Sequence, residues 1–266
     1  MSAQAWVPLA VVASSLLPGL VIFLLPEDRR GWRAMLNLAG AIAKLGLVGL
    51  MLWNVGRFHE YEARMTVLPG LDLVLRADEL SLLFMALSAL LWLLTTVYAI
   101  GYLEDSPHRS RFFGFFSLCV SATAGIALAG NLFTLFVFYE ILTLVTYPLV
   151  IHRGTPAALA AGRTYLLYTV PAGALLLLAV VAGHVLTGPQ DFVGGGYLKP
   201  FGDEHTPALV LLFAALVTGF GVKAALVPLH GWLPLAMVAP APVSALLHAV
   251  AVVKAGAFAI VRVVYE

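Results

Sequence analysis

The stretch Gly221-Val-Lys-Ala-Ala-Leu-Val-Pro-Leu-His-Gly-Trp-Leu-Pro234 places a lysine, Lys223, five residues before a proline, Pro228, in an otherwise apolar segment. Pro228 has no backbone N–H for the carbonyl of Ala224, so a helix must kink or open within one turn of the lysine. Non-helical backbone persists at bilayer depth only where protein or a water-filled cavity satisfies it. We therefore expect a discontinuous helix with freed carbonyls and water beside Lys223. A simple bend with a snorkelling lysine is disfavoured, because a mid-span ammonium reaches neither interface easily.

Composition sets the class of protein. The 266 residues are 61% hydrophobic and 11% charged, with a mean hydropathy of +0.96, which is typical of an integral membrane protein. A formal net charge of +1 gives no reason to expect nucleic acid as a partner. The single cysteine, Cys119, excludes an internal disulfide and multi-cysteine metal or iron–sulfur sites. We expect no cofactor, no metal and no catalytic chemistry of the chain's own.

The apolar runs predict an all-α polytopic membrane protein of about eight transmembrane helices, each near the roughly 20 residues that cross a bilayer. The first run reads as a retained span rather than a cleaved signal peptide. The longer connections, 56–78 and 187–206, should face the same side. The first alternates around Pro69-Gly70 and predicts a small β-hairpin, whereas the second holds Gly194 to Gly196 and predicts an irregular loop. The predicted spans are 6–25, 33–55, 79–103, 111–129, 131–151, 162–186, 207–237 and 242–264.

Basic residues indicate the orientation of the chain. Loops on one side carry most of the arginines, and the positive-inside rule makes this side cytoplasmic. Both termini then face outward. The residues on the richer side are Arg29, Arg30, Arg33, Arg109, Arg111, Arg153 and Arg163. The other side has Lys199 and Arg262, together with Arg57, Arg64 and Arg76 in the hairpin loop.

Five ionisable residues fall near the middle of predicted spans, where each costs about 2.5–3.5 kcal/mol on insertion scales. Such residues are usually functional and paired. They are Lys44, Glu140, Lys223, His248 and Lys254.

Glu140 shares a helical face with Thr143 and Tyr147, which could form a short hydrogen-bonded polar track. A purely structural carboxyl that holds two helices together is the alternative. We hypothesise that Glu140 and Lys223 form a carboxyl–amine couple that takes up and releases a proton as their separation changes.

The last span holds His248 and Lys254, which lie roughly 9 Å apart along a helix and about 120° apart around it. They could bracket a chain of waters. His248 could instead be a hydrogen-bonded interior histidine. His230 follows the break and could line its polar pocket. Lys44 has no evident partner, and a contact with another subunit is one interpretation of it.

Several stretches together resemble the antiporter-like subunits shared by respiratory complex I, the Mrp-type multisubunit cation/proton antiporters and the membrane-bound hydrogenases. They are Asn131 to Tyr147, Gly221 to Pro234, Pro242 to His248, and Asp78 to Phe84 continuing through Gly101 to Leu103.

The resemblance implies that the glutamate of the fifth helix pairs with the lysine of the broken seventh helix. The eighth helix then passes the proton to a polar axis at mid-membrane. These roles fall on Glu140, on Lys223, and on His248 or Lys254. Some branches of the family have the proton carrier of the eighth helix at the position of His248, and others have it at the position of Lys254. This chain has an ionisable residue at both positions, so the resemblance does not indicate a single subfamily.

Two features depart from the family pattern. Leu235 stands where many relatives have an acidic residue. Relatives usually have about fourteen helices, including two inverted repeats. This chain matches only part of that pattern. Residues 1–110 correspond to three leading helices with the hairpin loop, and residues 111–266 correspond to one five-helix repeat with a proton half-channel. We expect other integral membrane subunits as partners, including a chain that supplies the second repeat, and protons and sodium as ions. The expected location is a bacterial or archaeal-type inner membrane, in multi-pass form.

Three functions remain open. The favoured one is a proton-conducting subunit of a cation/proton antiporter or related ion-driven uptake complex. The second is the same module in a redox enzyme, such as a complex I-like dehydrogenase or a hydrogenase. The third is a transport-inactive scaffold.

Overall fold

The computed structural model describes residues 3–54, 61–189, 191–196 and 202–265. Within these residues, seven helical spans are long and apolar enough to cross a membrane, so the chain is a multi-pass membrane protein. Six are single helices: α1 (Ala3–Phe23), α2 (Arg30–Asn54), α3 (Glu79–Tyr102), α4 (Arg109–Ala127), α5 (Leu132–Val150) and α6 (Pro156–Thr187). The seventh, Ala241–Tyr265, joins α9 (Ala241–Ala245), the π-helical turn η3 (Leu246–Val250) and α10 (Val252–Tyr265).

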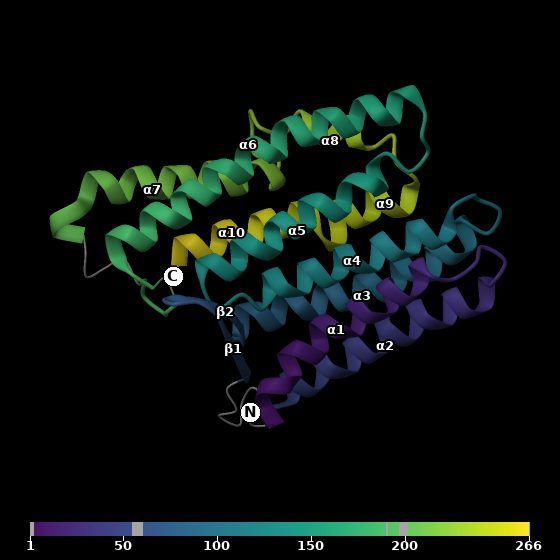
Figure 1. Cartoon of the computed structure of the whole chain (residues 1–266), viewed down its shortest axis with the longest axis horizontal. Coiled ribbons are helices and arrows are strands. Elements are labelled where there is room, and N and C mark those ends of the chain that lie inside the picture. The colour runs from purple at the N-terminus through teal and green to yellow at the C-terminus, as the bar shows by residue number, and fades with distance from the viewer. Residues whose placement is uncertain (1–2, 55–60, 190, 197–201, 266) are drawn as a thin grey trace.

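The predicted span 207–237 is two separate helices, α7 (Gly202–Lys223) and α8 (Trp232–Ala236). The discontinuous seventh helix and the all-α class are therefore confirmed. Figure 1 shows the long helices side by side, with α1 and α2 at one edge of the bundle and α6 and α7 at the other. The start of α1 and the end of α10 both lie at the end of the bundle that carries the hairpin (Figure 1).

The β-hairpin is present as predicted. Strands β1 (Tyr61–Leu68) and β2 (Leu71–Ala77) pair antiparallel, and the turn between them uses Gly70 at a φ of +79°. The hairpin docks on the turn between α4 and α5, where the Gly130 N–H donates to the Val74 carbonyl at 2.8 Å. The Gly130 carbonyl accepts in turn from the Phe192 N–H at 2.9 Å. The hairpin thereby covers one end of the bundle.

The second connection is irregular over residues 191–196, with a turn at Gly194, as predicted, but α7 already begins at Gly202, inside the predicted loop 187–206. Residues 190 and 197–201 of that connection lie outside the described residues. Two of the basic residues that enter the orientation argument, Arg57 and Lys199, lie outside them as well.

Local capping explains where the spans begin. The side chains of Asp78, Asn131 and Thr155 accept hydrogen bonds from the N–H groups of the first turns of α3, α5 and α6. Pro156 follows Thr155 at the first helical position, where its missing N–H leaves no bond unmade.

Helix α4 is the most enclosed of the seven spans. Small residues allow this close packing. A Cβ atom on Gly114 would lie 2.6 Å from the Phe23 ring of α1, and one on Gly125 would lie 2.1 Å from the Phe138 ring of α5. The helix therefore lies between α1 and α5.

Candidate functional site

The break that ends α7 lies directly after Lys223. Ala225 adopts the left-handed conformation, with φ at 55°. The Ala225 N–H donates to the Val222 carbonyl at 3.1 Å, and the Leu226 N–H donates to the Gly221 carbonyl at 2.9 Å. This pair of bonds is a Schellman motif. The predicted break within one turn of Lys223 is present, but a helix cap forms it, three residues before Pro228.

The carbonyl groups at this helix end have donors. The Trp232 indole N–H, from α8, donates to the Val222 carbonyl at 2.7 Å. The Tyr139 hydroxyl, from α5, donates to the Phe220 carbonyl at 3.1 Å. With the Schellman bonds, the carbonyls of residues 220, 221 and 222 are all satisfied. The expectation of freed carbonyls beside Lys223 is therefore wrong for these three groups, because neighbouring helices and the cap supply their donors.

Lys223 is buried, with 1% of its surface exposed. Its ammonium donates to the backbone carbonyl of Tyr139 and lies 3.4 Å from the centroid of that residue's ring. Helix α10 packs directly on the same helix end, where a Cβ on Gly256 would lie 2.2 Å from the Ala224 nitrogen. The lysine is thus held by α5 and α7 and backed by α10.

Glu140 follows Tyr139 in α5, and its carboxyl group lies against Gly173 of α6. A Cβ on Gly173 would be 2.6 Å from Oε2 of Glu140. The Oε1 atom of Glu140 is buried without a hydrogen-bond partner. Within the described parts of the chain, the ion pairs closer than 4.0 Å involve neither Glu140 nor Lys223. The two predicted groups therefore occupy neighbouring positions around Tyr139 without direct pairing.

Of the two predicted polar residues of α5, only one lies next to Glu140 and Lys223. Thr143 is buried, and its hydroxyl donates to the Tyr139 carbonyl at 3.3 Å, which is the group that also accepts from Lys223. Tyr147 is half-buried, and its ring lies beside Gly162 of α6. Neither side chain is hydrogen-bonded to the Glu140 carboxyl in the residues that the structure describes, so the polar track stays a prediction.

The predicted residues of the last span lie away from the pair. His248 is exposed and sits in η3, where the Ala251 N–H donates to the Leu246 carbonyl five residues earlier. Lys254 is half-buried in α10 and lines an apolar cavity of about 250 Å³ facing α3. His230 and Pro228 are both exposed. The structure therefore brings together Glu140, Lys223 and Thr143, and places the other five predicted residues apart from them.

Sequence reasoning missed several residues of this region. Tyr139 contributes a carbonyl and a ring, Gly173 makes room for the carboxyl, and Trp232 caps the helix end. The one sequence feature that could have indicated this site is Gly173, a small residue on the helix that follows the helix of Glu140.

Lys44 is buried inside the leading helices, with 1% of its surface exposed. Its ammonium donates to the Ser15 hydroxyl at 2.7 Å and to the Val120 carbonyl at 3.4 Å, and it lies 5.1 Å from the Trp92 ring. Its interpretation as a contact with another subunit is therefore wrong, because neighbouring helices of the same chain enclose it.

Comparison with known families gives two matches. Residues 129–265, more than half of the chain, match the family described as "NADH:quinone oxidoreductase/Mrp antiporter, TM". Residues 70–113 match the family described as "NADH-Ubiquinone oxidoreductase (complex I), chain 5 N-terminus".

Two relatives illustrate the range of similar proteins. The chain is 33% identical over 252 residues to a probable K(+)/H(+) antiporter subunit of Rhizobium meliloti, across 91% of this chain and 24% of the relative. It is 36% identical over 199 residues to an NADH-quinone oxidoreductase subunit of Desulforudis audaxviator, across 74% of this chain and 39% of the relative. The chain therefore spans well under half the length of either relative.

Solved structures share the fold. A chain of the Mrp complex from a Dietzia species superposes with a TM-score of 0.82 at 23% identity, across 99% of this chain and 49% of the other. A chain of the membrane-bound sulfane sulfur reductase, described as an archaeal respiratory membrane complex, superposes with a TM-score of 0.80 at 19% identity, across 98% of this chain and 52% of the other.

Proposed function

Because this chain belongs to the NADH:quinone oxidoreductase/Mrp antiporter family of transmembrane proteins, we propose that it conducts protons as one member of a multisubunit cation/proton antiporter or related ion-driven uptake complex. Its partners are then further integral membrane subunits, and its ions are protons and sodium. Relatives in bacteria and a structural neighbour in an archaeal respiratory membrane complex support an inner cell membrane of this type.

The observation that carries the proposal is the arrangement around Tyr139. Lys223 is fully buried and bonded to the carbonyl of the residue that precedes Glu140, whose own Oε1 atom lacks a partner. An unsatisfied buried carboxyl oxygen is costly, and a buried ammonium has the same need for a partner. A short movement of the ammonium from the Tyr139 carbonyl to Glu140 would satisfy both groups. Such alternation between two partners is what transfer of a proton through a Glu–Lys couple requires.

The next carriers in this proposal are Lys254 and His248. Support comes from α10, which packs on the end of α7 through Gly256, two residues beyond Lys254. The π-helical turn that holds His248 comes shortly before α10 in the same span, and such turns are frequent at functional sites. The five-helix unit 111–266 would thus hold the proton half-channel, and residues 1–110 would form its leading helices.

The test is proton flux through the assembled complex in sealed vesicles that contain a pH-sensitive dye. We expect Glu140→Gln and Lys223→Ala each to lower the flux at least about tenfold, since a positioned proton donor or acceptor typically contributes factors of this size or more. Glu79→Gln, which changes an exposed carboxyl at the start of α3, is the matched control and should leave flux unchanged. Wild-type flux in both site variants, with normal assembly, would contradict the proposal and favour a transport-inactive scaffold.

A redox-coupled complex is the second candidate, because the NADH-quinone oxidoreductase relative is as similar to this chain as the antiporter relative is. The two candidates differ in their energy source. Sodium-dependent proton flux without an electron donor supports the antiporter. Co-purification with iron–sulfur or nickel subunits, and flux that needs an electron donor, support the redox enzyme.

A further inference from the structure

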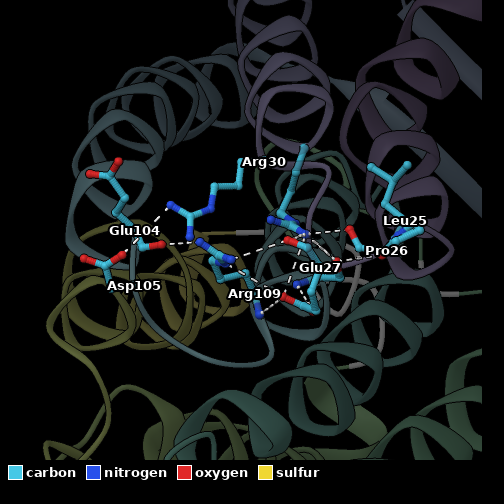
Figure 2. A network of polar contacts seen from close by, with 9 residues as sticks. Leu25, Pro26, Glu27, Arg30, Glu104, Asp105 and Arg109 are labelled. Atoms are coloured by element: carbon cyan, nitrogen blue, oxygen red, sulfur yellow. Dashed lines mark hydrogen bonds and ion pairs between the residues drawn. The ribbon is translucent and has the colours of Figure 1, made fainter.

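A cavity of about 260 Å³ opens between α2, α3 and the start of α4, at the end of the bundle opposite the hairpin. Three arginines line it, together with one glutamate and five apolar or small residues. The polar residues of the lining are Arg30, Arg33, Arg109 and Glu104. Figure 2 shows Arg30 and Arg109 pointing toward one another across this region, with Glu27 beside them. The site is remote from Lys223 and Glu140, so it is independent of the proposed function.

The apolar walls of the cavity make a cleft between two helices. Gly31 of α2 and Gly101 of α3 both line it, and a Cβ atom on either would meet no heavy atom within 4 Å. Trp32 and Tyr102, the residues that follow these glycines, are 56% and 43% exposed. Exposed tryptophan and tyrosine side chains are typical of the membrane–water interface. The cleft therefore lies at headgroup depth, on the side that the positive-inside rule makes cytoplasmic.

Two of the three guanidinium groups are fixed by the protein. Arg33 donates to the Ser110 hydroxyl at 2.9 Å and to the Pro26 carbonyl at 3.0 Å. Arg109 donates to the Glu104 carbonyl, and its buried Nε atom has no hydrogen-bond partner. The Glu27 carboxylate lies 3.8 Å from both guanidinium groups and offsets part of their charge.

Arg30 is held much more loosely. The structure gives its side chain an ion pair to Asp105 at 3.9 Å, in which the two side chains are 54% and 96% exposed. A pair this long and this exposed contributes little, because water screens it. Arg30 can therefore turn to a better acceptor. The cleft offers one movable and two fixed guanidinium groups beside apolar walls, and Glu104 is the only carboxylate in the described lining.

We propose that this cleft binds an anionic phospholipid, with its phosphate between Arg30 and Arg109 and its glycerol and upper acyl segment along Gly31 and Gly101. Guanidinium groups form strong charge-assisted hydrogen bonds with phosphate oxygens, and Arg30 can supply them because its ion pair to Asp105 is long and exposed. The cytoplasmic leaflet is the leaflet that presents anionic lipids, and basic pockets between helices on that side suit their headgroups.

The test uses the protein purified in detergent with its partner subunits. Its melting temperature is followed while phosphatidylglycerol, phosphatidylcholine or inorganic phosphate is added. We expect phosphatidylglycerol to stabilise it more than phosphatidylcholine, and phosphate alone to have no such effect. Arg30→Gln should weaken the apparent phosphatidylglycerol affinity by roughly five- to tenfold, as expected for loss of one charge-assisted contact. Arg29→Gln, a neighbouring exposed arginine outside the cleft, is the charge control.

Gly101→Leu tests the cleft without changing charge, because its side chain would occupy open space rather than clash with the protein. It should abolish the phosphatidylglycerol effect while the lipid-free melting temperature stays the same. Gly49→Leu, at a similarly open glycine of α2 outside the cleft, should leave the effect intact. Equal stabilisation by both lipids, the same loss in Arg29→Gln as in Arg30→Gln, or reproduction of the shift by phosphate alone would each overturn the proposal.

Discussion

At the scale of single residues, the site depends on a glycine, because its lack of a side chain makes room for a carboxyl group. Gly173 of α6 leaves the space that the Glu140 carboxyl occupies, since a Cβ there would lie 2.6 Å from Oε2. Tyr139 has the complementary role, because its backbone carbonyl accepts from both Lys223 and Thr143. The distance between carboxyl and ammonium is therefore set by neighbours that do not titrate in the proposed transfer.

We predict that Gly173→Ala displaces the Glu140 carboxyl and lowers proton flux several-fold, because the new methyl group needs the space of the carboxylate oxygens. Vesicle flux and the melting temperature should be measured together. Gly162→Ala is the matched control in the same helix, since its methyl group would crowd Ile151 and Tyr147 rather than Glu140. Equal loss of flux in both variants would show a general packing effect, against a specific role for Gly173.

At the scale of elements, the decisive feature is the end of α7. The Schellman motif stops the helix directly after Lys223, and Ala225 takes the left-handed position that glycine usually occupies. An alanine in this conformation costs roughly 1 kcal/mol relative to glycine. The break is therefore built with some strain, although Trp232 and Tyr139 reinforce it.

Ala225→Gly should raise the melting temperature by about 2 °C, because glycine adopts the positive φ without the steric cost of a Cβ atom. Ala224→Gly, at the neighbouring position where φ is not positive, should lower it or leave it unchanged. The comparison requires thermal unfolding of both variants in one detergent. A lower melting temperature for Ala225→Gly would contradict the cap assignment.

At the scale of the whole molecule, a polar clamp joins the leading helices at the end opposite the hairpin. Glu27, between α1 and α2, accepts hydrogen bonds from the backbone N–H groups of Arg109 and Ser110 at the start of α4. Partial burial alone would raise the pKa of Glu27. The backbone hydrogen bonds from Ser110 and Arg109 and the charge of Arg33 outweigh burial and lower the pKa below its ordinary value of 4.5.

The lowered pKa of Glu27 predicts a pH-dependent contribution to stability. A carboxyl whose folded pKa is depressed stabilises the fold above its unfolded pKa, and this contribution is lost as the pH falls through the folded value. Glu27→Gln should therefore lower the melting temperature at pH 7 by no more than a few degrees, given that the side chain is half-exposed. The difference from wild type should shrink well below pH 4.5.

The control for this prediction is Glu104→Gln, whose carboxyl lies in the neighbouring cavity but does not accept from the α4 backbone. It should not lower the melting temperature at pH 7 as Glu27→Gln does. A Glu27→Gln difference that stays constant from pH 7 to below pH 4.5 would contradict the clamp.

The sequence is sufficient to predict the membrane class, most of the spans, the hairpin and the break near Lys223. These follow from local physics, since hydropathy over about 20 residues, turn chemistry and capping act between near neighbours in the chain. It also selected Glu140 and Lys223, because an ionisable residue in a bilayer is costly wherever its partners lie.

The contacts of these residues depend on how the helices pack against one another. The Tyr139 carbonyl, the space at Gly173, the Trp232 cap and the enclosure of Lys44 all join residues from different helices. The sequence also did not predict that His248 is exposed or that Lys254 lines the apolar cavity facing α3. Helical periodicity fixes which residues share a face, but packing between helices decides which face meets which neighbour, and that information is not local.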